Sequence, residues 1–153
     1  MLETIEKDLS CNLEQLSKQL KASKTPDVSA FSQTLFHFFG NEKEREYINI
    51  LVISRRDPFF AQGYLLTLKN LLCDICIADK KILKTEKDIT LVNITFSSLV
   101  DILLNCICNT SLTLEETNEM IIGLLQNGYY ITLTNRFGID ALNNPFAVQN
   151  DRI

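Results

Sequence analysis

The apolar run between Tyr47 and Pro58 is the feature that most constrains the fold of this chain. Positions 48–53 are apolar except for Asn49, and they lie between a charged block and a proline-containing loop. A short run rich in Ile and Val, bounded by turn signals, is typical of a buried strand. The residue before a proline is also disfavoured in helical geometry. The run therefore predicts a strand over 47–54, around which the rest of the chain is wound.

Two further segments have the composition of strands. Residues 89–96 are dense in β-branched side chains, which favours a second buried strand. Because Val92 and Phe96 also fit one face of a helix, a helical interpretation of this segment stays open. A third strand is predicted over 129–134, after an Asn-Gly pair that ends the preceding element.

Elsewhere, apolar residues recur at helical spacing. These patterns predict helices over 2–22, 26–39, 60–75, 99–108 and 111–126. Strands that alternate with helices indicate a small, mostly parallel sheet covered by helices, which is an α/β fold. The alternative is an all-α bundle, and it requires both 47–54 and 89–96 to be helical.

The length of 153 residues predicts a single domain. Within it we expect an N-terminal amphipathic helix over 1–22, a core over 26–137 and a loop-like tail over 138–153. The tail is assigned as a loop because Asn, Gly and Pro recur in it.

The charge balance and the cysteine count bound the environment of the protein. A net charge of −4 argues against a large phosphate-binding face. The charged N-terminal sequence lacks the apolar segment of a secretory signal, and no apolar run reaches the ~20 residues of a membrane span. Five cysteines, an odd number, favour free thiols in a reducing compartment. We therefore expect an intracellular protein, nuclear or cytoplasmic, with no membrane association.

No pattern in the sequence supplies a catalytic or cofactor-binding site. A phosphate-binding loop needs glycines, and although Lys24 and Thr25 resemble the end of such a loop, no glycine precedes Gly40. The single histidine, His37, lies in an aromatic helical segment, where packing is the simpler explanation. We expect no enzymatic activity and no cofactor.

Two cysteine pairs could be taken for a zinc site. Cys73 and Cys76 are spaced as in many zinc sites, but they lie in an apolar helical segment rather than on a tight turn. Cys106 and Cys108, two residues apart in another helix, would point to different faces. Buried thiols that act as small hydrophobic side chains are the better interpretation, and no metal site is expected.

The segment after the first predicted strand is the candidate partner-binding site. It contains two arginines followed closely by two phenylalanines: Arg55, Arg56, Phe59 and Phe60. Open α/β sheets place their ligands at the carboxyl ends of their strands. Arginine and aromatic side chains are also enriched in the parts of protein interfaces that dominate affinity. A solvated loop with one anchoring phenylalanine is the alternative.

The sequence resembles the small, divergent RecA-like recombinase paralogues, including the partners of SWIM-domain proteins in Shu-type recombination complexes. The resemblance covers about 26–137. It rests on an apolar strand ending in Arg-Arg-Asp-Pro, on 94–104 (ITFSSLVDILL), and on a strand ending at Thr134-Asn135. Lys24 and Thr25 match a degenerate nucleotide loop. The glycine loop and the metal-binding Asp of the family are missing, so the resemblance implies a member that does not hydrolyse ATP.

This resemblance implies a non-catalytic subunit of a homologous-recombination DNA-repair complex. Such a subunit would assemble with recombinase paralogues and would reach single-stranded DNA through the complex. The alternative function, which goes with the all-α fold, is an acidic helical adaptor or chaperone-like protein-interaction module.

Overall fold

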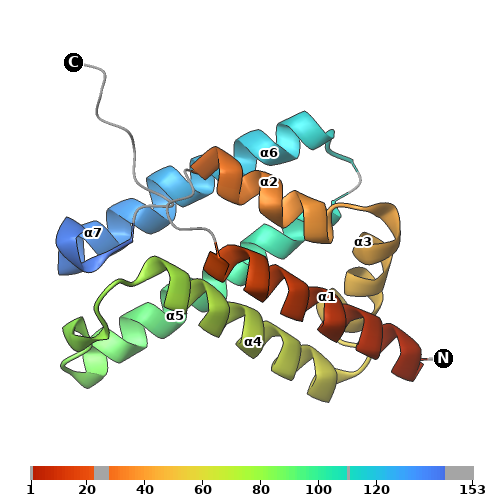
Figure 1. The fold of residues 1–153 in the computed structure, drawn as a ribbon, viewed down its shortest axis with the longest axis horizontal. Helices are drawn as coiled ribbons and strands as arrows, with labels where there is room; N and C mark the ends of the chain where they lie inside the picture. The colour runs from red at the N-terminus through yellow and green to blue at the C-terminus, as the bar shows by residue number, and fades with distance from the viewer. Residues whose placement is uncertain (1, 23–27, 110, 144–153) are drawn as a thin grey trace.

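The structure, a computed structural model, describes residues 2–22, 28–109 and 111–143. In these residues the ordered elements are helices, and no strand is present (Figure 1). One isolated antiparallel bridge joins Ile77 to Leu142. The predicted α/β fold with its parallel sheet is therefore wrong, and the alternative all-α bundle fits the structure.

Eleven helical segments follow one another in the described residues. The π-helical segments η1 and η3 continue their neighbours, and η2 and η4 are separate short 3₁₀ turns. In order they are α1 (Leu2–Ala22), α2 (Val28–Phe39), α3 (Glu42–Ile48), η1 (Asn49–Ile53), α4 (Pro58–Cys76), η2 (Lys80–Ile82), α5 (Glu86–Cys108), α6 (Leu114–Gly123), η3 (Leu124–Tyr130), α7 (Ile131–Phe137) and η4 (Ile139–Ala141).

The segment 47–54 is helical rather than extended. It forms the end of α3 and the π-helical turn η1. Its most buried side chains are Ile48, Leu51 and Val52, and the spacing of three and four residues between them is that of one helix face. The predicted strand over 47–54 is wrong because periodicity alone cannot distinguish a short buried helix from a buried strand. The helix ends at Ser54, and the next residue, Arg55, has a φ of 52°.

The predicted strand 89–96 lies inside the long helix α5. Thr85 and Asp88 form a capping box at its start: the Thr85 hydroxyl accepts from the Asp88 N–H, and the Asp88 carboxylate accepts from the Thr85 N–H. Val92 is 3% exposed and Ile94 is 59% exposed, whereas a strand would turn both to the same face. Tertiary burial of one stripe overrides the β-propensity of the composition.

The third predicted strand, 129–134, is also helical and spans η3 and α7. Tyr129 and Leu133, four residues apart, are buried, while Ile131 between them is 45% exposed. The hydroxyl of Thr132 donates to the Gly128 carbonyl at 2.7 Å, which satisfies this β-branched side chain within the helix. The backbone is helical at both junctions, so 114–137 forms one continuous helical rod (Figure 1).

Helix α5 lies at the centre of the bundle and packs against α2, α3, α4 and α6. Its buried side includes Phe96, whose ring meets the Tyr129 ring edge-on at 5.0 Å. By length and composition alone α5 could cross a membrane, but 50% of its apolar window is buried inside the bundle. That burial is what the core helix of a helical bundle shows.

Several expectations outside the sheet are confirmed. The first helix ends at Ala22 as predicted, and Leu9, Leu13, Leu16 and Leu20 form its buried stripe. Helix α6 lies within the predicted 111–126 helix, and a capping box formed by Thr113 and Glu116 marks its start. The predicted start of the second helix at 26 lies outside the described residues.

The beginning of the predicted loop-like tail is docked on the bundle. The Ala78 N–H donates to the Ala141 carbonyl at 3.0 Å, and the Asn143 N–H donates to the Cys76 carbonyl at 2.9 Å. Ala141 and Leu142 are buried. These contacts fasten 138–143 to the C-terminal end of α4, while the rest of the tail, 144–153, lies outside the described residues.

Candidate functional site: a groove between two parallel helices

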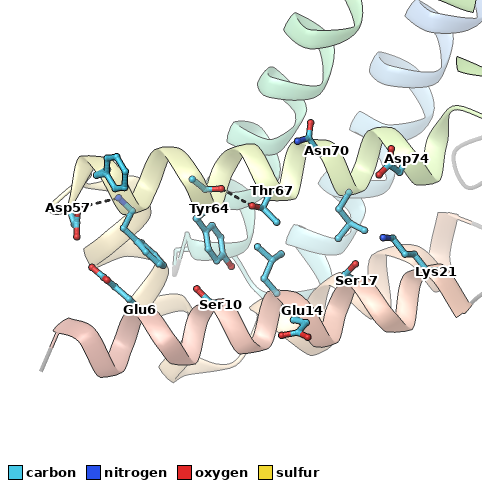
Figure 2. Close-up of a pocket in the computed structure, with 15 residues that line it drawn as sticks. Glu6, Ser10, Glu14, Ser17, Lys21, Asp57, Tyr64, Thr67, Asn70 and Asp74 are labelled. Carbon is cyan, nitrogen blue, oxygen red and sulfur yellow. Dashed lines mark hydrogen bonds between the residues drawn. The ribbon is translucent and has the colours of Figure 1, made fainter.

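A groove of about 780 Å³ lies between α1 and α4. The two helices lie side by side and run in the same direction (Figures 1 and 2). On α1 the lining residues recur at helical spacing and form one stripe: Glu6, Ser10, Leu13, Glu14, Ser17 and Lys21. On α4 and its N-cap the facing stripe contains Asp57, Phe59, Phe60, Gly63, Tyr64, Thr67, Asn70, Leu71 and Asp74.

The floor of the groove is apolar. Leu13, Tyr64 and Leu71 lie along it, and each is buried against the core. The hydroxyl oxygen of Tyr64 is inaccessible to water and has no hydrogen-bond partner in the described structure. Burial, followed by the nearby Glu44 carboxyl, raises the pKa of this phenol. Tyr64 is therefore a neutral ring that rigidly supports the groove.

Small side chains keep the upper walls of the groove open. Ser10 and Ser17 stand on α1, and Thr67 stands on the facing α4 (Figure 2). Gly63 of α4 also lines the groove. A Cβ added at Gly63 would meet no atom within 4 Å. The Thr67 hydroxyl donates to the Gly63 carbonyl at 2.9 Å and so does not project across the opening. These walls leave room for side chains of another molecule.

One end of the groove holds two carboxylates, Glu6 and Asp57, which face each other from the two helices (Figure 2). Hydrogen bonding between the pair raises the pKa of Glu6 and lowers that of Asp57. Asp57 is also the N-cap of α4, and it accepts from the Phe60 N–H at 3.1 Å. Among the described residues neither carboxylate has a basic partner within ion-pair distance.

The opposite end of the groove carries both signs of charge. Lys21 comes from the last turn of α1 and Asp74 from the end of α4 (Figure 2). Asp74 is paired with Lys80, whereas no ion pair of Lys21 is found in the described residues. Midway along the rim, Glu14 lies 3.8 Å from Lys18 on the solvent side of α1. The unpaired charges are therefore negative at the Glu6 end and positive at the Lys21 end.

The two phenylalanines of the predicted partner site belong to this groove, whereas the two arginines do not line it. Phe59 is 88% exposed at the rim, and Phe60 is half-buried with its ring 5.9 Å from that of Tyr64. Arg55 instead lines two smaller hollows beside α5. Arg56 is exposed and lines none of the cavities described for this chain. The structure thus separates four residues that the sequence had grouped.

The other residues singled out from the sequence do not form a common site in the described structure. Thr134 and Asn135 lie within α7 rather than at the end of a strand, and Asn135 is exposed. His37 is exposed on α2, and its ring packs edge-on against Phe38. Lys24 and Thr25 lie outside the described residues.

The cysteines of the two pairs behave as packed thiols. Cys76, Cys106 and Cys108 are buried, and Cys73 is half-buried. Burial raises the pKa of all four thiols, so they are protonated at neutral pH. No group of three or more potential metal-ligating side chains is found in the described residues.

Each wall of the groove has a local feature in the sequence. Glu6, Ser10, Glu14 and Ser17 flank the leucine stripe of the first helix at helical spacing, which is the arrangement of a solvated helix face. Only the parallel approach of α4 turns that flank into one wall of a cavity. The isolated Gly63 in an otherwise helical pattern was the corresponding signal on α4, since such a glycine often has a packing or functional reason.

Comparison of the chain with protein-family models, with curated proteins and with solved structures found no match in any of the three. The resemblance to recombinase paralogues is therefore neither supported nor refuted by relatives.

Proposed function

We propose that this chain is an all-helical, acidic protein-interaction module that receives a segment of a partner protein in the groove between α1 and α4. The observation that carries the proposal is the groove itself. It joins an apolar floor to an open rim with an exposed aromatic ring, Phe59, and with unpaired carboxylates. A concave apolar surface with a few placed polar groups is the usual form of a binding site.

An exposed phenylalanine at the edge of such a groove supports a protein partner. Isolated apolar side chains on a surface are ordinary, but Phe59 adjoins a cavity whose floor is already apolar. Aromatic side chains, phenylalanine among them, are enriched in protein interfaces relative to the rest of the surface. Phe59 and the half-buried Phe60 therefore keep the partner-binding role expected for them, now as part of this groove.

The proposal is tested by closing the groove without disturbing the core. Gly63→Gln places a long polar side chain on the groove wall and replaces a glycine by a better helix former, so the protein should fold at least as well. Gly123→Gln in α6 is the matched control, because a Cβ there also meets no atom within 4 Å and the position lies away from the groove.

The readout is photo-crosslinking from a reactive side chain at Thr67, with an identical probe at the exposed Glu119 of α6 as the reference. A partner that uses the groove crosslinks from position 67, not from 119, and is lost with Gly63→Gln but retained with Gly123→Gln. Partners that crosslink equally from both positions, or that survive Gly63→Gln, would show that the groove is not the binding site.

The recombination-complex hypothesis remains a prediction that no observation here tests. Its structural motivation was a strand over 47–54 with a ligand-binding loop at its end, and that segment is helical. Purification from its source would examine it directly: recovery with a recombinase paralogue would support it, and recovery as a stable monomer would count against it.

A further inference from the structure

We propose that the segment bound in the α1–α4 groove is an amphipathic helix that runs antiparallel to both helices, with a Lys or Arg of its last turn between Glu6 and Asp57 and an acidic residue of its first turn beside Lys21. This inference rests on the proposed function and specifies the partner's chemistry and direction.

The dimensions of the groove suit one face of a short helix. From Glu6 to Lys21 the α1 wall extends 15 residues, which is about 22 Å or four helical turns. A volume of 780 Å³ over that length corresponds to a cross-section of about 35 Å². Such a section admits side chains but not a whole helix, so one apolar stripe would enter while the backbone lies along the rim.

A helical occupant also satisfies its own backbone. An extended peptide that binds by β-augmentation pairs its N–H and C=O groups with an exposed strand edge, and the described residues contain no strand. A helix makes these hydrogen bonds internally and presents side chains at positions i, i+3, i+4 and i+7 to an apolar groove. The floor formed by Leu13, Tyr64 and Leu71 matches such a stripe.

The unpaired charges fix the direction of the partner. Glu6 and Asp57 hold two carboxylates close together with no basic partner among the described residues, and their mutual effect on each other's pKa reflects this proximity. A cation inserted between them would relieve like-charge repulsion and gain charge-assisted hydrogen bonds. At the other end Lys21 is the free cation of the described rim, and it attracts a carboxylate.

Helix dipoles favour the same direction. The N-termini of α1 and α4 lie at the Glu6 end, and an antiparallel helix would place its C-terminus there. Basic residues stabilise the C-terminal turn of a helix and acidic residues its N-terminal turn. An antiparallel partner therefore has its own preferred charges at the ends where the groove supplies their opposites.

Two synthetic 16-residue peptides test this inference, both acetylated and amidated and both with one leucine stripe at helical spacing. The forward peptide has two Glu in its first turn and two Arg in its last turn, and the reverse peptide exchanges them. Binding is measured by fluorescence anisotropy to the wild-type chain and to the double variant Glu6→Lys/Lys21→Glu, which keeps the net charge. The control is Glu119→Lys/Lys84→Glu, away from the groove.

The wild-type chain should bind the forward peptide about five- to twentyfold more tightly than the reverse peptide, as expected for two partly exposed charge contacts. The Glu6→Lys/Lys21→Glu variant should reverse this preference, the control variant should keep it, and 0.5 M salt should reduce it. Comparison between proteins cancels any difference in the helicity of the free peptides. Both peptides should lose binding with Gly63→Gln.

Any other result would overturn the inference, and the possible results can be told apart. Equal binding of both peptides, abolished by Gly63→Gln, would keep the groove as a protein site but refute the direction. No binding of either peptide would refute a helical occupant. The proposed function would then still be decided separately by the Thr67 crosslinks. If the Glu6→Lys/Lys21→Glu variant kept the preference for the forward peptide, these charges would not determine the direction of the bound helix.

Discussion

Arg136 near the end of α7 donates from Nε and Nη2 to Oδ1 of Asp88, at 3.1 and 2.5 Å, across 48 residues of chain. Asp88 is at the same time the capping-box carboxylate of α5. The hydrogen bonds from Arg136, followed by those from Thr85, lower the pKa of Asp88. One carboxylate thus starts the central helix and fastens the last one to it.

Replacing Arg136 with Gln should destabilise the fold at pH 7 by removing this tie. Because the folded pKa of Asp88 is lowered, its contribution to stability is present above the ordinary aspartate pKa and is lost as the pH falls through the folded pKa. Urea unfolding of both proteins should therefore show a difference in unfolding free energy at pH 7 that shrinks as the pH falls below the ordinary pKa of aspartate. Lys18→Gln, which breaks the exposed Glu14–Lys18 pair, should change stability by less than about 0.5 kcal/mol. If the difference in unfolding free energy between the wild type and Arg136→Gln were the same at all pH values, this explanation would be wrong.

Glu44 is a buried carboxyl in α3 whose Oε1 has no hydrogen-bond partner in the described structure. Burial, and next the Asp8 carboxyl, raise its pKa to about 7, and Lys43 opposes them. A raised carboxyl pKa means that the folded state holds a proton that the unfolded state releases. Stability contributed by this group therefore falls as the pH rises from about 4.5 to 7.

Glu44→Gln should remove that loss. We expect the variant to be about 1 to 2 kcal/mol more stable than the wild type at pH 8, a figure already reduced for partial solvent access, and about equally stable at pH 4. Chemical unfolding at the two pH values measures the difference. The exposed Glu42→Gln on the same helix should show no such pH-dependent gain. If Glu44→Gln were destabilising at pH 8, the carboxylate would have a stabilising role that its surroundings do not indicate.

Replacing Gly63 or Gly40 with alanine should change the stability of the fold in opposite directions. Gly63→Ala in the middle of α4 should stabilise the fold by about 0.5 to 1 kcal/mol, because its Cβ meets nothing within 4 Å and alanine is the better helix former. Gly40→Ala should destabilise it, since the new Cβ would lie 2.7 Å from the Phe36 carbonyl oxygen. Thermal unfolding of the two variants compares them directly. Equal shifts of the same sign would mean that the turn between α2 and α3 relaxes freely.

Val92 and Ile94 separate the helical structure of α5 from the predicted strand. Val92→Ala should destabilise the fold by about 1 to 3 kcal/mol, because Val92 is 3% exposed. Ile94→Ala should change stability by less than about 0.5 kcal/mol, because Ile94 is 59% exposed. A strand would put both side chains on one face and make the two changes similar. Denaturant unfolding of the pair decides between these outcomes.

The sequence by itself determined the elements whose signals are local. The leucine stripe of α1 marks its full length, and the Thr113–Glu116 capping box places the start of α6, because caps and amphipathic stripes depend on residues within a few positions of one another. The buried state of Cys76, Cys106 and Cys108 was also readable from their apolar surroundings.

Only the tertiary structure decided between strand and helix over 47–54, 89–96 and 129–134. These runs have the β-branched composition of strands, and each becomes helical because one helical stripe of it packs into the common core. The groove likewise could not be assigned from the sequence alone. Its walls come from α1 and α4, which are separate in the chain, and polar residues beside an apolar stripe line a cavity only when a second helix lies alongside them.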